Sequence, residues 1–171
     1  MEKLPGLARS HPQIAALVLG GLSALGFQPF HLWPVGLAAV GAFGWLAWRA
    51  TGWRSALLAG WLFGLAHFTI TNNWIATAFT YQAEMPAILG WAAAPLLSLY
   101  LAIWPALATC VAWCAARRRG LLTFALVFGA MWIGAEWLRS WVFSGYAWGP
   151  LSMMVLGPWD RPGLAAALPL T

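Results

Sequence analysis

Charged side chains are scarce in this sequence. They make up 8% of its 171 residues, while 62% of the residues are hydrophobic. An average soluble domain is about 25% charged and about 45–50% apolar. With so few polar residues, a compact soluble protein of this length cannot cover its surface. The composition therefore excludes a soluble globular protein and predicts an integral membrane protein.

Cysteine is rare, and metal-ligand spacing is absent. The two cysteines, Cys110 and Cys114, are four residues apart on one helical face, where a disulfide is not expected. The three histidines, His11, His31 and His67, fall in separate segments. We therefore predict no metal site and no cofactor.

Acidic residues are fewer than basic ones. Nine Lys and Arg against four Asp and Glu give a net charge of +5. These cations are dispersed among apolar runs and form no continuous basic face, so we predict no nucleic-acid partner. The 14 tryptophans favour a lipid interface instead.

Five apolar windows approach or reach the roughly 20 residues that a helix needs to cross the hydrocarbon core. They are 14–27, 32–48, 56–75, a window within 87–115, and 121–142. The fourth is longer than one crossing needs and contains Pro95 and Pro105, so we expect a tilt or kinks. A last apolar stretch, 164–170, begins like a sixth span, and we expect the sequence to be truncated there. The predicted fold is a single all-α polytopic membrane domain over residues 1–171.

The N-terminal segment has a second interpretation. Lys3 and Arg9 precede an apolar core, as in a secretory signal. The next segment, however, is again hydrophobic over a membrane-spanning length and is not a soluble domain. We therefore interpret residues 14–27 as the first span.

The positions of the cations predict the orientation, because cytoplasmic loops are enriched in Lys and Arg. With a cytoplasmic N-terminus, seven of the nine cations lie on the cytoplasmic side: Lys3, Arg9, Arg49, Arg54, Arg117, Arg118 and Arg119. The opposite side receives Arg139 and Arg161. We therefore predict that the N-terminus is cytoplasmic.

The predicted outer segments, 28–31, 71–86 and 144–162, collect polar and aromatic side chains. Our candidates for a substrate-facing or lipid-facing surface are Asn73, Trp74, Tyr81, Arg139, Tyr146 and Trp148. Capped helix ends and an interfacial aromatic belt would explain the same pattern.

Glu136 and Arg139 lie within the fifth window, where charged side chains are costly and are functional candidates by default. Their spacing of three residues places them on one face near the outer helix end. One interpretation is a self-neutralised pair that holds this end. The other is a contact between Arg139 and a lipid headgroup.

Two pairs of small residues predict close helix packing. Gly60 and Gly64, and likewise Ala130 and Gly134, are spaced by four residues. Such spacing lets backbones approach closely in lipid.

No complete catalytic constellation is present. A nucleophile needs an adjacent base, but the segment of Cys110 and Cys114 contains no histidine or acid, and the only lysine is Lys3. Ser144 with His67 could be imagined as an intramembrane protease pair. However, Val142 stands where such enzymes typically have glycine.

Four motifs, in order, resemble the apolipoprotein N-acyltransferase family of Gram-negative bacteria. GFQPFHLWP at 26–34 resembles its first outer loop, and GWLFG at 60–64 with NWI at 73–75 resembles its third helix. ATAFTYQAEMP at 76–86 is similar to the following loop. EWLRSW at 136–141, with GYAW at 145–148, resembles the end of the fifth helix.

The resemblance implies a multi-pass inner-membrane protein with two lipid substrates. A phospholipid would donate an acyl chain, and the α-amine of a diacylglyceryl apolipoprotein would accept it. In the family a Glu-Lys-Cys triad performs this transfer in a periplasmic nitrilase-like domain, which is preceded by a sixth helix. Glu84, Glu136, Lys3, Cys110 and Cys114 are not members of that triad.

The sequence supports two function classes. The first is the membrane anchor of an N-acyltransferase, which we expect to be inactive alone. The alternative is a small non-enzymatic membrane protein, such as a transporter component or an assembly partner.

Overall fold

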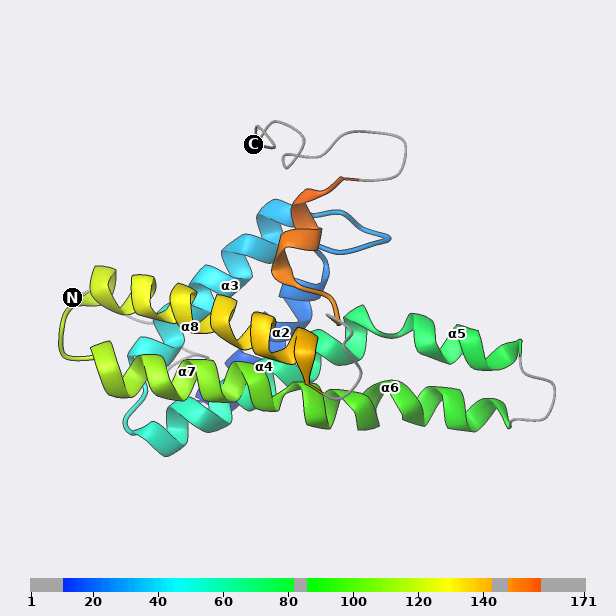
Figure 1. The fold of residues 1–171 in the computed structure, drawn as a ribbon, viewed down its shortest axis with the longest axis horizontal. Helices are drawn as coiled ribbons and strands as arrows, with labels where there is room; N and C mark the ends of the chain where they lie inside the picture. Colours follow the sequence, from blue (N-terminus) through cyan, green and yellow to red (C-terminus); the bar gives the residue numbers. More distant parts are fainter. Residues whose placement is uncertain (1–10, 82–85, 143–147, 158–171) are drawn as a thin grey trace.

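The computed structural model describes residues 11–81, 86–142 and 148–157. Within these ranges the chain is helical and has no strand (Figure 1). The helices are α2 (Pro12–Ala24), α3 (Trp33–Trp48), α4 (Trp53–Thr71), α5 (Trp74–Thr80), α6 (Ala87–Leu101), α7 (Ile103–Ala116), α8 (Leu121–Trp141) and the 3-10 helix η1 (Leu151–Val155). The all-α prediction is confirmed for the described residues.

Proline and glycine set several of the helix ends. Pro12 and Pro34 stand in the first turns of α2 and α3, where the missing N–H is not needed for helix bonding. Gly120 precedes α8 with a φ of 90°, a conformation that glycine adopts without a Cβ penalty. It reverses the chain between α7 and α8.

The long fourth window is broken at Ala102, between α6 and α7. Pro105 has no N–H to donate to the carbonyl of Leu101, four residues earlier, so the regular bonding is interrupted there. The kink expected from the two prolines is therefore found beside Pro105, while Pro95 lies inside α6.

Helix α4 is the central element of the bundle. It packs against α2, α6 and α7, while α8 packs against α7 and α3. Helices α5 and α6 pair with each other and extend away from the other helices, to the right in Figure 1.

Aromatic rings fill the core where α3, α4 and α8 meet. The rings of Phe43 and Phe63 stack with centroids 4.2 Å apart. Phe128 lies 6.0 Å from Phe43, and Trp132 meets Phe63 edge-on at 5.8 Å. Such offset and edge-to-face pairs stabilise a core beyond the area they bury.

The predicted close packing is present at only one of the two small-residue pairs. A Cβ added to Gly60 would lie 2.7 Å from the carbonyl oxygen of Pro105, and one added to Gly64 would lie 3.0 Å from the Cα of Ala102. These glycines therefore let α4 approach α7 closely. A Cβ at Gly134 would meet nothing within 4 Å, so the second pair forms no such contact among the described residues.

Two helical stretches are long and apolar enough to cross a bilayer, Ile88–Ala116 and Leu121–Trp141. The apolar helices α2 and α3 have 13 and 16 residues, and at 1.5 Å per residue even α3 is about 24 Å long, short of the roughly 30 Å hydrocarbon core. The exposed face of α8 carries large apolar side chains: Leu122, Leu126, Ile133, Trp137 and Trp141. Such a face is unusual in contact with water.

Candidate functional site

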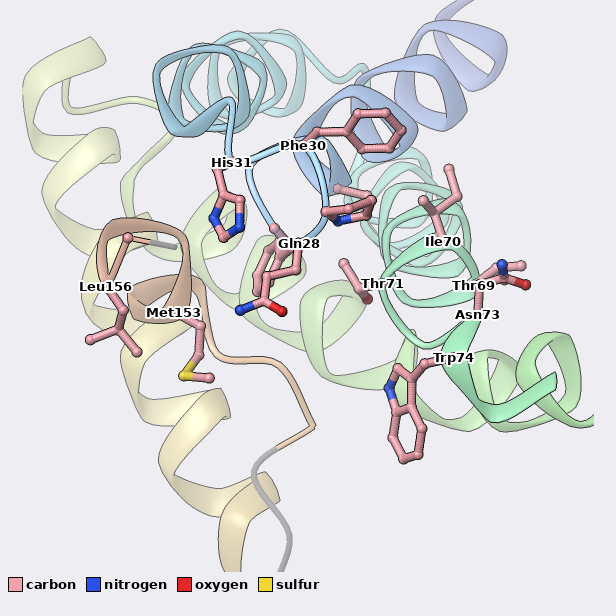
Figure 2. A pocket seen from close by; sticks show the side chains of 14 residues that line it. Gln28, Phe30, His31, Thr69, Ile70, Thr71, Asn73, Trp74, Met153 and Leu156 are labelled. Atoms are coloured by element: carbon pink, nitrogen blue, oxygen red, sulfur yellow. The ribbon is translucent and has the colours of Figure 1, made fainter. Parts of the chain in front are cut away.

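A cavity of about 1080 Å³ opens where the loop after α2, the end of α4, the start of α5 and η1 converge (Figure 2). This volume is slightly above the usual range of about 300–1,000 Å³ for small-molecule sites. Its walls combine apolar and hydrogen-bonding side chains, with Phe30, Trp74 and Met153 beside Gln28 and Asn73. The cavity can therefore accommodate a ligand that has both apolar and polar parts.

The loop between α2 and α3 forms one wall. Gln28 and Pro29 are joined by a cis peptide bond, and His31 has a φ of 53°. Backbone bonds from Phe30 and His31 to the carbonyl of Phe27, and from Leu32 to Leu25, close this loop on itself. In Figure 2 the Gln28 side chain lies between Met153 of η1 and Thr71 of α4.

Helix η1 forms the opposite wall and is fixed in two ways. The Glu136 carboxylate accepts hydrogen bonds from the Leu151 backbone N–H at 2.9 Å and from the Trp132 indole N–H at 3.0 Å. Met154 is buried, and its sulfur would lie within 3 Å of a Cβ at Gly26 or Gly36. Glycine at these two positions therefore makes room for η1 beside α2 and α3.

A buried serine–histidine pair lies behind the cavity. The Ser23 hydroxyl is 2.7 Å from Nδ1 of His67, and it also donates to the Gly20 carbonyl at 2.6 Å. Both residues are at most 1% exposed. Phe27 lines the cavity and meets the His67 ring edge-on at 5.4 Å. The serine is therefore shielded from any ligand, and the pair is a packing contact between α2 and α4.

Arg139 lies inside the bundle. It is 2% exposed, and its guanidinium carbon lies 4.8 Å from the ring centre of Phe68 on α4. Its spacing from Glu136 had suggested either a helix-end ion pair or a headgroup contact at the outer interface. In the structure the side chain points into the bundle toward the Phe68 ring of α4, and it interacts electrostatically with Glu136, which also accepts hydrogen bonds from Trp132 and Leu151.

The other predicted site residues are distributed unevenly. Asn73 and Trp74 line the cavity. Tyr81 follows α5 at 85% exposure and is not among the lining residues. Trp148 is half-buried with a φ of 43°, and Tyr146 lies outside the described residues.

Several residues that line the cavity were not predicted from the sequence. Gln28 and His31 belong to the GFQPFHLWP motif, which carries part of the family resemblance but was not expected to form the site. Met153 and Leu156 come from η1 and the residue after it. The hydrogen bond from Leu151 to Glu136 brings η1 back beside α8, and no spacing in the sequence indicates this.

Residues 19–170 match the family model described as the apolipoprotein N-acyltransferase N-terminal domain. The chain belongs to the apolipoprotein N-acyltransferase family. Curated relatives with that name include a protein of Ralstonia nicotianae, 35% identical over 78% of this chain, and one of Vibrio vulnificus, 33% identical over 79%. A Rhodopseudomonas palustris relative is 32% identical over 91% of the chain. The chain spans 26% of the first two relatives and 32% of the third.

The matched N-acyltransferase region includes the whole cavity. All of its lining residues, from Ala24 to Gly157, fall within residues 19–170. The described residues contain no group of three His, Cys, Asp or Glu side chains able to hold a metal ion. The cavity can bind and orient a ligand. The Ser23–His67 contact behind it is buried, so a ligand in the cavity does not reach the serine hydroxyl.

Proposed function

We propose that this chain is the membrane-embedded part of an N-acyltransferase of lipoprotein maturation, with one multi-pass helical domain in the bacterial inner membrane. Its substrates would be a phospholipid acyl donor and a diacylglyceryl apolipoprotein acceptor. The family match over residues 19–170 carries this proposal. The exposed apolar face of α8 supports placement in lipid.

The cavity is the proposed place where a lipid-bearing substrate is received. Both proposed substrates carry acyl chains next to polar groups, and the cavity offers Phe30, Trp74 and Met153 next to Gln28 and Asn73. In the proposed orientation it lies at the outer end of the bundle, at the N-terminal end of α3 and beyond the C-terminal end of α4. A substrate entering from the outer leaflet could reach it without crossing the membrane.

The transfer chemistry itself is assigned to residues outside this chain. Cys110 and Cys114 lie in the last two turns of α7, at the end of the bundle away from the cavity. A Glu-Lys-Cys triad requires a lysine, and the single lysine of this sequence is Lys3, near the N-terminus. We therefore expect the 171-residue chain alone to bind a lipid substrate without acylating it.

Site-specific photocrosslinking tests the proposed binding. A photoreactive phenylalanine analogue replaces Trp74 in the chain reconstituted in lipid nanodiscs, and a labelled diacylglyceryl cysteine peptide is added. The matched control carries the analogue at Trp141, which is 73% exposed on α8. We expect a saturable adduct at position 74 that unlabelled peptide displaces, and only non-saturable labelling at 141. Equal, non-displaceable labelling at both positions would refute the binding role.

A chimera tests the family function. This chain replaces the corresponding region of the Ralstonia nicotianae relative, and N-acylation of a diacylglyceryl peptide is measured. We expect the chimera to N-acylate the peptide and the 171-residue chain alone not to do so. A folded chimera without activity would favour the non-enzymatic alternative.

A further inference from the structure

A second cavity lies at the other end of the bundle from the substrate cavity. It is a shallow pocket, open at the surface, with a volume of about 350 Å³, and it is lined by Trp48, Arg49, Arg117 and Arg118. These residues come from the α3–α4 and α7–α8 turns, which both lie toward the left in Figure 1. Helix α3, about 24 Å long, separates this cavity from the loop that lines the first one.

Two reciprocal hydrogen bonds hold these turns together. The indole N–H of Trp48 donates to the Arg117 carbonyl at 3.1 Å, and the indole N–H of Trp113 donates to the Ala50 carbonyl at 3.1 Å. Each turn thus provides one backbone carbonyl that accepts a hydrogen bond from a tryptophan beside the other turn. The spacing of the two basic turns is therefore fixed by the fold.

Tryptophan rings also orient the arginines. The guanidinium of Arg117 lies 4.2 Å from the ring centre of Trp113. The guanidinium of Arg49 lies 5.5 Å from the ring centre of Trp45. A guanidinium stacked on a ring keeps its N–H groups at the edge free to meet an oxyanion. Ordering before binding reduces the entropy lost on binding.

The charge at this end favours an anionic ligand. Three arginines line one small, open pocket. Glu136 is the one acidic residue within the described ranges, and it lies fifteen positions along α8 from Leu121, about 22 Å away. Glu136 therefore cannot neutralise these arginines.

We propose that this cavity binds the phosphate of an anionic phospholipid headgroup from the adjacent leaflet. Arginine pairs with phosphate through two parallel N–H···O bonds, and basic pockets between transmembrane helices bind such headgroups. Tryptophan at the membrane interface suits a position at headgroup depth. The proposal rests on the membrane placement of the bundle and not on acyl transfer, so it can fail or hold independently of the enzymatic function.

Binding of a fluorescent phosphatidylglycerol to the purified chain in neutral detergent tests the proposal. The test variant is the double substitution Arg49→Gln and Arg118→Gln, since both side chains are exposed. The control is Arg54→Gln with Arg119→Gln, which removes the same charge from the same end of the bundle but outside the cavity lining. A hydrogen bond from a pocket-lining arginine to the phosphate contributes at least about fivefold in affinity, whereas an arginine outside the pocket contributes only long-range attraction. We expect a loss of about 25-fold for the test variant and a much smaller loss for the control.

Further arms identify the source of the phosphate. Phosphatidylcholine is expected to compete weakly, and millimolar inorganic phosphate is expected not to displace the lipid. Equal losses in the two double variants would show a diffuse charge effect and overturn the proposal. Displacement by inorganic phosphate alone would overturn the assignment to a lipid.

A second variant tests the paired turns. Trp113→Phe removes the hydrogen bond to Ala50 but keeps a ring under Arg117. It should weaken lipid binding without abolishing it, because the two turns lose one of their two connecting bonds. Unchanged binding would contradict the proposed role of the paired turns.

Discussion

Ser23 and His67 form a polar contact between two predominantly apolar helices, α2 and α4. Each is almost completely buried, and the Ser23 hydroxyl reaches both His67 and the Gly20 carbonyl. A buried polar group without a partner costs more free energy than an ordinary hydrogen bond contributes. The pair therefore fixes the position of α2 on α4 behind the cavity of about 1080 Å³.

Replacement of Ser23 should destabilise the bundle. In Ser23→Ala the buried His67 loses its hydrogen-bond partner, and we expect a loss of about 1–3 kcal/mol in the free energy of unfolding. The matched control is Ser140→Ala, because the Ser140 hydroxyl makes an exposed hydrogen bond to the carbonyl of Trp137 on its own helix. Unfolding in detergent, followed by circular dichroism, measures both. Similar stability of the two variants would show that the buried pair contributes nothing special.

Single residues were only partly predictable from the sequence. Asn73 and Trp74 were predicted at a substrate-facing or lipid-facing surface, and they line the cavity because they lie directly after the end of α4. The inward position of Arg139 could not be predicted, since it depends on Phe68 of a different helix. Likewise, Ser23 is 44 positions away from His67.

At the scale of elements, glycine decides how closely α4 and α7 approach. Gly60 faces the backbone at Pro105 in α7, and Gly64 faces Ala102 just before α7, so a side chain at either glycine would meet backbone atoms, which cannot move aside cheaply. Interiors packed this tightly resist added methyl groups.

An added methyl group should therefore have opposite effects at two glycines. Gly60→Ala places a Cβ 2.7 Å from the Pro105 carbonyl oxygen, and we expect a destabilisation of about 1–3 kcal/mol. Gly134→Ala meets nothing within 4 Å and should stabilise α8 by up to about 1 kcal/mol through helix propensity. Thermal unfolding of both variants in one detergent checks this. The prediction fails if Gly60→Ala is as stable as the parent protein.

Glu136 links η1 to α8, and its replacement should release that element. Glu136→Ala leaves the N–H groups of Leu151 and Trp132 without their acceptor, so we expect faster amide hydrogen exchange over residues 151–155. Glu136→Gln retains a side-chain oxygen at the same place and should exchange at nearly the parental rate. Equally fast exchange in both variants would mean that the negative charge, and not the hydrogen bonds, holds η1.

The helical elements were largely predictable, but their connections were not. Apolar windows indicated α2, α3, α4 and α8, and Pro105 indicated the break beside Ala102. Helix α5 and η1 are short, and their positions depend on packing against α6 and on the bond to Glu136. Short elements leave no periodic pattern that a sequence could show.

At the scale of the molecule, the bundle has two chemically different ends. One end carries Gln28, Asn73 and Trp74 around the larger cavity, and the other carries Arg49 and Arg117 around the smaller one. The distribution of Lys and Arg along the sequence already predicted which turns share the basic side. The larger cavity required the fold, because its walls come from four separate segments.

The bundle is expected to cross the membrane with the larger cavity outside and the basic turns inside, and the proposed entry of a substrate from the outer leaflet depends on this orientation. Single cysteines, Gln28→Cys or Arg118→Cys, test it in a chain whose Cys110 and Cys114 are replaced by alanine. Both test positions are exposed. Labelling with a membrane-impermeant maleimide in intact spheroplasts, and again after permeabilisation, is the measurement. We predict that position 28 is labelled in intact spheroplasts and that position 118 is labelled only after permeabilisation; labelling of position 118 in intact spheroplasts would contradict this orientation.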